Sequence, residues 1–153
     1  IKTGIAANQL DDKSSFKVIL LLDVIEHLAD PTDFMTQLCR DFPNVSTFII
    51  TVPARQELWS SHDDFNQHFR RYDLSMIDNL AEQCNLIVSF KRYFFNLLYI
   101  PIRLLKNRSS DHKAPQGFLK FLHSVISIFC YFEYIIMPKR VYGSSIISVL
   151  SRR

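Results

Sequence analysis

The sequence predicts an α/β fold in which helices cover a sheet of largely parallel strands. Two short runs rich in Val, Ile and Leu, residues 16–22 and 45–52, are typical of strands that are buried on both faces. A helix signal lies between them, and a strand, a helix and a second strand in this order form a βαβ unit with parallel strands. At 153 residues, with 48% hydrophobic and 22% charged residues, the chain has the composition of a single globular domain.

The helix between the two runs is marked by the dipeptide Asp30-Pro31. Asp30 is a preferred N-cap residue, Pro31 suits the first helical position, and Pro43 ends the helix. A second helix is predicted to start after Asp73 and to end at Asn85 in a left-handed conformation. Both helices therefore have recognisable start and stop signals.

Two further strands are predicted at residues 86–95 and 145–150. A long polar loop is expected at residues 53–72, and loops of that length inside a compact domain are usually functional. Within this loop, His62, Asp63 and Asp64 are more easily explained as solvated charges than as part of a metal site.

Polar side chains follow the first predicted strand. Asp23, Glu26 and His27 lie within five residues of one another, and the loop at 53–72 leaves the same edge of the sheet. Ligands of open α/β sheets bind outside the carboxyl ends of the strands. We therefore expect these residues and the segment around residues 68–72 to border one crevice.

Several motifs together carry a family resemblance. They are D-x-x-E-H at 23–27, the D-P helix start, H-x-R-R-Y at 68–72 and the closing YGSSIISVL. In combination they resemble the C-terminal half of class I S-adenosylmethionine-dependent methyltransferases, closest to the group that includes ubiquinone-type O-methyltransferases. The likeness covers roughly residues 16–95 and 141–150.

The resemblance implies the C-terminal half of a Rossmann-like methyltransferase sheet. The four strands would be the fourth to the seventh of seven, with the last two forming an antiparallel pair. Residues 1–153 would then be a single partial domain that lacks the N-terminal half with the cofactor loop, and residues 96–140 would be an apolar helical insertion.

The resemblance also implies roles for the residues after the first strand. Asp23 and Val24 would border the cofactor, and Glu26 and His27 would be catalytic, with His27 as the base that removes a proton from the acceptor. In ubiquinone-type members, residues matching Asp23, Glu26 and His27 hold a divalent metal, and this donor mix suits magnesium, manganese or zinc. The simpler alternative is that Glu26 and His27 cap the following turn.

The H-x-R-R-Y segment matches the part of the family that borders the acceptor. His68, Arg71 and Tyr72 would accordingly bind the substrate. An alternative is that the segment folds over the edge of the sheet, with Tyr72 packed as an anchor.

The family binds its cofactor chiefly through a glycine-rich loop, which this sequence lacks. Its only glycines are Gly4, Gly117 and Gly143. We therefore expect residues 1–153 alone to bind S-adenosylmethionine poorly and to be inactive. The function predicted for the intact parent is methyl transfer to an oxygen of a small or lipid-linked acceptor. The alternatives are a non-catalytic membrane-peripheral binding module with a degenerate fold, or a metal-dependent hydrolase.

The insertion suggests a contact with lipid. Residues 118–137 are almost entirely apolar, but Lys120, His123 and Glu133 would be costly inside a bilayer. We expect this segment to be a helix that lies on a membrane or covers an apolar acceptor, rather than one that spans. A buried core helix is the simpler alternative.

Cysteine usage indicates the compartment. Cys39, Cys84 and Cys130 are scattered and form no CxxC pair, which favours reduced thiols and a cytoplasmic location, with peripheral membrane contact through the insertion. We expect no nucleic-acid partner.

Overall fold

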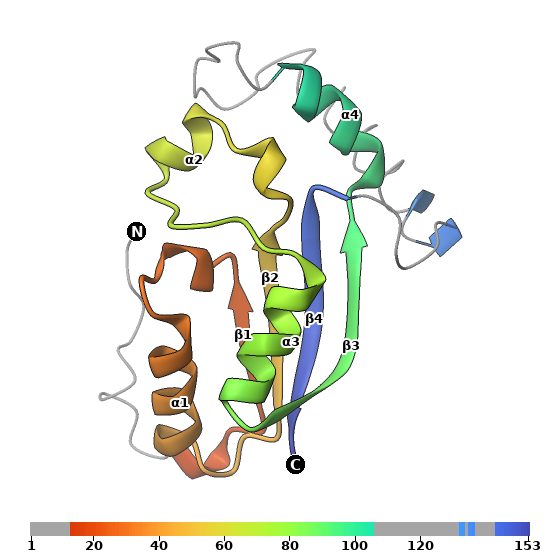
Figure 1. The fold of residues 1–153 in the computed structure, drawn as a ribbon. Helices are drawn as coiled ribbons and strands as arrows, with labels where there is room; N and C mark the ends of the chain where they lie inside the picture. Colours follow the sequence, from red (N-terminus) through yellow and green to blue (C-terminus); the bar gives the residue numbers. More distant parts are fainter. Residues whose placement is uncertain (1–12, 106–131, 134, 137–142) are drawn as a thin grey trace, which may run out of the picture.

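The structure is a computed structural model that describes residues 13–105, 132–133, 135–136 and 143–153. Its elements, in chain order, are η2 (Lys13–Ser15), β1 (Val18–Leu22), η3 (Ile25–His27), α1 (Pro31–Asp41), β2 (Thr47–Pro53), η4 (Gln56–Leu58), α2 (Ser61–Phe65), α3 (Leu74–Gln83), β3 (Leu86–Phe94), α4 (Asn96–Leu105) and β4 (Ser145–Arg152). Figure 1 shows α1 and α3 in front of a twisted sheet, with the β2–α3 connection and α4 above it.

The four strands form one sheet in the order β1-β2-β4-β3. β1 and β2 are parallel, whereas β4 lies antiparallel between β2 and β3. The α/β fold class, the parallel βαβ unit and the antiparallel pairing of the last two strands are therefore confirmed. The predicted strand limits differ from the observed ones by no more than two residues.

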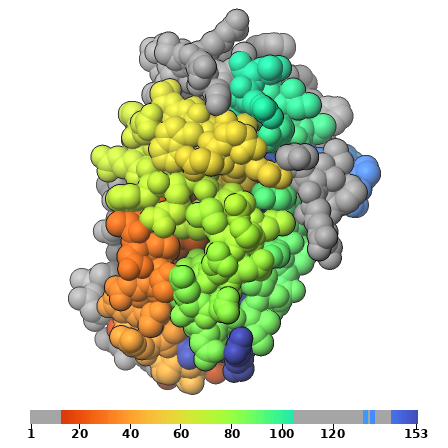
Figure 2. Space-filling model, viewed as in Figure 1, coloured from red at the N-terminus to blue at the C-terminus, as the bar shows by residue number. Residues whose placement is uncertain are grey.

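One face of the sheet forms the core. Side chains alternate in burial along β2 and β4, and the fully buried Phe48, Ile50, Ile146 and Leu150 belong to the same core cluster as Met35 of α1. The space-filling view from the same side shows the surfaces of α1 and α3 in front of these strands (Figure 2). The helices thus cover the sheet from one side.

The prediction that the first strand is buried on both faces was wrong. Val18, Leu20 and Leu22 are 47%, 58% and 56% exposed, and Leu21 is the one residue of β1 that is buried. β1 is an edge strand of the described sheet, and α1 and α3 pack on the opposite face from these three side chains. Apolar content alone could not distinguish one covered face from two.

The expected helix signals are confirmed. The Asp30 carboxylate accepts hydrogen bonds from the backbone N–H groups of Thr32 and Asp33, with Pro31 in the first turn. At the end of α3, Asn85 has φ 55°, a left-handed conformation that asparagine tolerates.

The loop predicted at 53–72 is not plain loop. It contains η4 and the five-residue helix α2, which begins with a capping box formed by Ser60 and Asp63. The prediction missed α2 because the helix is too short to show an apolar period.

Of the predicted insertion, the structure describes α4 and a few residues of the segment 118–137. The helix predicted over 118–137 therefore lies largely outside the described residues. Within the described part of the chain, no helix is both long and apolar enough to cross a bilayer.

The Asp30 cap is expected to stabilise α1 measurably. Asp30→Ala removes the acceptor for two backbone N–H groups, so the free energy of unfolding should fall by about 1 kcal/mol in urea titrations. Asp30→Asn keeps an acceptor oxygen and should lose much less. Equal losses for the two variants would contradict the capping role.

Candidate functional site

The β2–α3 connection is anchored at its two ends. Ala54 and Tyr72 form an isolated parallel bridge, in which Arg55 N–H donates to Tyr72 O at 2.9 Å and Tyr72 N–H donates to Pro53 O at 2.9 Å. The chain between them must therefore loop out from the carboxyl end of β2 and return to it.

The turn after β1 is tied to the same end of β2. Asp23 has φ 52°, its N–H donates to Thr51 O at 3.0 Å, and its carboxylate accepts from Thr51 Oγ1 at 3.2 Å. This sharp turn leads directly into η3, which carries Glu26 and His27.

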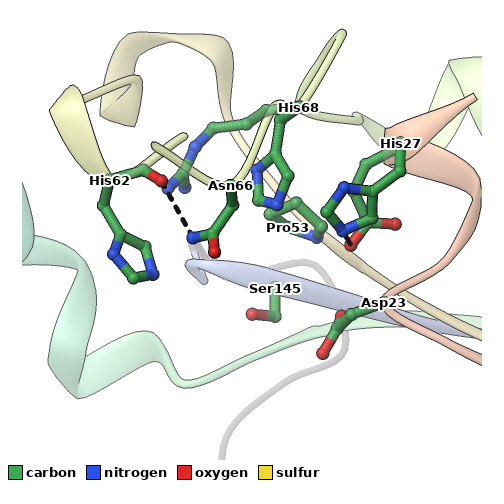
Figure 3. Close-up of a pocket in the computed structure, with 9 residues that line it drawn as sticks. Asp23, His27, Pro53, His62, Asn66, His68 and Ser145 are labelled. Atoms are coloured by element: carbon green, nitrogen blue, oxygen red, sulfur yellow. Dashed lines mark hydrogen bonds and ion pairs between the residues drawn. The ribbon is translucent and has the colours of Figure 1, made fainter. Parts of the chain in front are cut away.

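The two loops contact each other through the backbone. Phe69 N–H donates to Glu26 O at 2.8 Å, and Tyr72 Oη donates to Ile25 O at 3.3 Å. As a result the rings of His27 and His68 meet edge to face, with centroids 4.6 Å apart. Figure 3 shows the two imidazoles side by side above Asp23.

A cavity of about 310 Å³ opens where these loops meet. It is lined by Asp23, Glu26, His27, Pro53, His62, Asn66, His68, Arg71 and Ser145. The crevice expected at the carboxyl ends of the first two strands is thus confirmed, except that Tyr72 does not line it. Its lining is mainly polar, with three histidines.

Three of the lining residues form a cluster that could hold a metal ion. Glu26, His27 and His68 each offer one ligand atom, and these atoms lie within 4.8 Å of one another. Asp23, which the resemblance included among the metal ligands, is not in this cluster. His68, which the resemblance assigned to substrate binding, is its third member. The role of each residue stays a prediction.

Glu26 is the unusual member of this cluster. Its side chain is fully buried, and neither carboxylate oxygen has a hydrogen-bond partner in the described structure. Burial is the main reason that the pKa of Glu26 rises to about 7, and the nearby Asp23 raises it further. Because a buried carboxylate without hydrogen bonds is costly, this arrangement fits a site that gains a cation.

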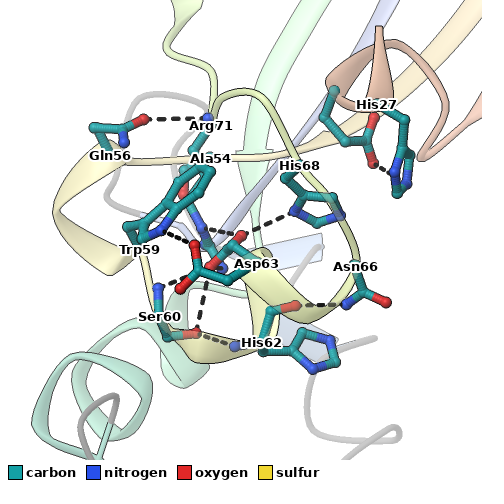
Figure 4. Close-up of polar contacts among 12 residues, drawn as sticks. His27, Ala54, Gln56, Trp59, Ser60, His62, Asp63, Asn66, His68 and Arg71 are labelled. Atoms are coloured by element: carbon teal, nitrogen blue, oxygen red, sulfur yellow. Dashed lines mark hydrogen bonds and ion pairs between the residues drawn. The ribbon is translucent and has the colours of Figure 1, made fainter.

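Asp63 orients the third member, His68. Its fully buried carboxylate accepts from His68 Nδ1 at 2.9 Å, from Arg71 Nε and Nη2 at 2.8 and 3.0 Å, and from Ser60 N–H at 2.9 Å (Figure 4). This leaves His68 Nε2 as the ring nitrogen available to a ligand, an arrangement common around protein-bound metals.

Asp63 was predicted to be a solvated loop charge, and that prediction was wrong. Burial alone would raise the pKa of Asp63, but the hydrogen bonds from Arg71 and His68 hold it below its usual value. The one sequence signal for this role was the spacing of Ser60 and Asp63, which is that of a capping box with Asp in place of Glu.

The remaining predicted site residues lie at the margins of the cavity or away from it. Val24 is half-buried against the core. Tyr72 is only 2% exposed, and burial raises its pKa to about 12. It borders a separate cavity of about 290 Å³ between α1 and α3. Because its side chain is buried, Tyr72 packs as an anchor of the loop.

The described residues do not by themselves fit the methyl donor. The only glycine among them is Gly143, which precedes β4, so no glycine-rich turn lies at the carboxyl end of β1 or β2.

No protein-family model and no curated protein matches the sequence. Among solved structures, the chain is similar to a SAM-dependent methyltransferase from Archaeoglobus fulgidus, with 14% identity and a TM-score of 0.47 over 95% of this chain and 63% of that one. It is also similar to a putative methyltransferase from Bacillus halodurans, with 12% identity and a TM-score of 0.49 over 96% and 69%. A third similar structure is the small RNA methyltransferase HEN1, with 11% identity and a TM-score of 0.46 over 92% and 14%. These figures describe a likeness in fold alone, and the chain spans only part of each of these proteins.

Loss of the Asp63 charge should destabilise the loop. Asp63→Asn leaves Arg71 buried without its carboxylate, so we expect the free energy of unfolding at pH 7 to fall by about 3 kcal/mol in urea titrations. Because the folded-state pKa is lowered, the contribution of the wild-type carboxylate is present above its unfolded pKa and is lost as the pH falls through the folded-state value. The gap between the two proteins should therefore narrow below about pH 4.

The neighbouring Asp64→Asn variant is the matched control for this experiment. Asp64 is exposed, so its substitution should change stability by less than about 1 kcal/mol. Equal unfolding midpoints for Asp63→Asn and wild type at pH 7 would show that the network is not stabilising.

The cluster of Glu26, His27 and His68 predicts binding of a divalent cation. Calorimetric titration with zinc or manganese should detect one site, and His68→Ala should weaken it at least about tenfold. His62→Ala is the control, because His62 lines the same cavity but is not a member of the cluster. Equal weakening by both substitutions, or no binding to the wild type, would remove the metal site.

Proposed function

We propose that the chain is the acceptor-side half of a class I S-adenosylmethionine-dependent methyltransferase, and that the intact protein methylates an oxygen of a small or lipid-linked acceptor. The observation that carries the proposal is the polar cavity at the carboxyl ends of β1 and β2, lined by the two motifs of the resemblance. The antiparallel pair formed by β3 and β4 agrees with the sheet that the resemblance implies.

Glu26, His27 and His68 would hold a divalent cation in this proposal. A bound cation acts as a Lewis acid and lowers the pKa of a hydroxyl that it contacts, so that the acceptor oxygen becomes a better nucleophile at neutral pH. Asp63 keeps His68 oriented, and the fully buried Glu26 supplies negative charge. The donor needs no activation by the protein, so the main task of the cavity is to align the acceptor.

His27 has a second role if no metal binds. Its side chain is 26% exposed at the cavity, and its Nε2 atom is 4.0 Å from Glu26 Oε1. It could then accept the proton of the acceptor hydroxyl as a general base. The mechanism with a bound metal and the mechanism with His27 as general base differ in one respect: only the mechanism with the metal requires a cation for turnover.

The donor side is assigned to the rest of the intact protein. Asp23 and Val24 would form the edge of the cofactor site, because they occupy the turn that follows β1. The glycine-rich loop would come from residues that precede this chain in the parent.

A metal-dependent hydrolase is the second candidate. It is favoured by Glu26, whose carboxylate accepts no hydrogen bond in the described structure and whose pKa of about 7 would suit a group that takes a proton from an attacking water. Release of product without consumption of S-adenosylmethionine would identify this activity. A protein that binds ligand but turns over neither substrate would be the non-catalytic module.

The proposal is tested by methyl transfer in the intact protein, with radiolabelled S-adenosylmethionine and an extract of polar lipids and small phenols as acceptors. His27→Ala should lower kcat by about a hundredfold or more and leave the Kd of S-adenosylmethionine within about threefold, since His27 acts on the acceptor. A chelator should abolish turnover if the mechanism uses a bound metal, and it should leave turnover unchanged if His27 acts as the general base. Unchanged kcat in His27→Ala would remove this residue from the mechanism.

A further inference from the structure

Helix α4 exposes apolar side chains on one of its faces. Leu97, Ile100 and Leu104 are 51%, 65% and 77% exposed, and their spacing places them on one stripe of the helix. On another side of α4, Tyr99 is only 8% exposed, and its hydroxyl donates to Oε1 of Glu57 in η4 at 3.1 Å. An ordinary surface helix would instead present polar residues to solvent.

A second helical segment is attached to the start of α4. The carboxylate of Glu133, which is 5% exposed, accepts from the N–H groups of Asn96 and Leu97 at 2.5 and 2.8 Å and from Asn96 Nδ2 at 2.6 Å. It therefore caps α4 and holds the chain around residue 133 against it. A glutamate used in this way need not be exposed to lipid.

The residues beside Glu133 point outward as well. Phe132, Ile135 and Ile136 are 53%, 61% and 77% exposed. We call the exposed side chains of the two segments the α4 surface; its members are Leu97, Ile100, Leu104, Phe132, Ile135 and Ile136. So many large exposed apolar side chains at one end of a small domain indicate an interaction site.

The charge of the surrounding sequence indicates that the partner is anionic. Residues 96–140 contain seven Lys and Arg residues but only two acidic ones, and one of these two is the buried Glu133. The basic excess attracts an anionic surface. It also opposes pairing of the α4 surface with a second copy of the chain, because the two copies would carry like charge.

From this combination we propose that the α4 surface docks the protein onto an anionic lipid bilayer, with its apolar side chains at the headgroup boundary and the basic excess of the sequence adding attraction to the anionic lipid. Apolar and basic groups together are what a peripheral membrane contact requires. The docking needs neither a metal nor a methyl donor, so it does not depend on the proposed methyl transfer.

Docking through α4 would also position the cavity. The bond between Tyr99 and Glu57 joins α4 to the connection that begins at Pro53 and carries His62 and His68 into the cavity. Figure 1 shows α4 beside this connection, above the neighbouring ends of β3 and β4. A lipid-linked acceptor, which rests on the proposed function, would thus reach the cavity from the bilayer.

The test is co-sedimentation of the 153-residue chain with vesicles in about 0.1 M salt, without metal or S-adenosylmethionine. Vesicles of phosphatidylcholine with about 30% phosphatidylglycerol should bind at least about tenfold more protein than phosphatidylcholine alone, and about 0.5 M salt should reverse most of the gain. Ile100→Glu should weaken binding about tenfold, because it places a carboxylate at the headgroup boundary.

Ile87→Glu is the matched control. Ile87 is 48% exposed at the start of β3, the opposite end of this strand from α4, so the same substitution there should leave vesicle binding unchanged. Circular dichroism should show that both variants are folded. Absence of binding to anionic vesicles, or equal losses in the two variants, would overturn the proposal. A dimer in light scattering that Ile100→Glu dissociates would overturn it in favour of self-association.

Discussion

The buried charge of Asp63 is the constraint on which the site depends. A charged carboxylate with no exposed surface is stable only when it is well paired, and the partners of Asp63 come from Ser60, His68 and Arg71. Arg71 in turn donates to Ala54 O at 3.1 Å, at the point where the connection leaves β2. Asp63 thus helps to fix the path of the twenty-residue connection, together with the backbone bonds at its ends, and it orients His68, which the Phe69–Glu26 backbone bond brings beside His27.

The site contains two buried carboxylates in opposite states. Asp63 is completely hydrogen-bonded and its pKa is lowered, whereas the Glu26 carboxylate accepts no hydrogen bond in the described structure and its pKa is raised to about 7. The first arrangement stabilises the fold and the second costs stability. A folded protein retains such a cost mainly where a ligand or a reaction makes use of it, and for this reason we place Glu26 rather than Asp63 at the centre of the proposed chemistry.

Local signals in the sequence predicted the fold well because the physics behind them is local. Asp30-Pro31 and Asn85 act through bonds within a few residues, and a βαβ unit has one preferred hand. The exposure of Leu20 and Leu22 was missed because burial depends on which elements cover a face. The cluster of His27 with His68 was also missed, since it arises from a backbone contact between Glu26 and Phe69, forty-three residues apart in sequence. The sequence correctly predicted at which edge of the sheet the site lies, but it could not predict which side chains contact each other there.

The position of β4 has a consequence for how the chain folds. β4 lies between β2 and β3, so these two earlier strands have no direct contact with each other in the sheet. Until β4 has been synthesised, the backbone groups of β2 and β3 that bond to β4 have no strand to pair with. During this time β3 has no hydrogen bonds to the other strands, and only the packing of α3 can hold it near them. The βαβ unit can form early from nearby segments, but closing the sheet requires contacts across about a hundred residues, as between Thr47 and Ser151. Assembly of this domain should therefore be limited by a late, long-range step, during which a chaperone would find unpaired strands to bind.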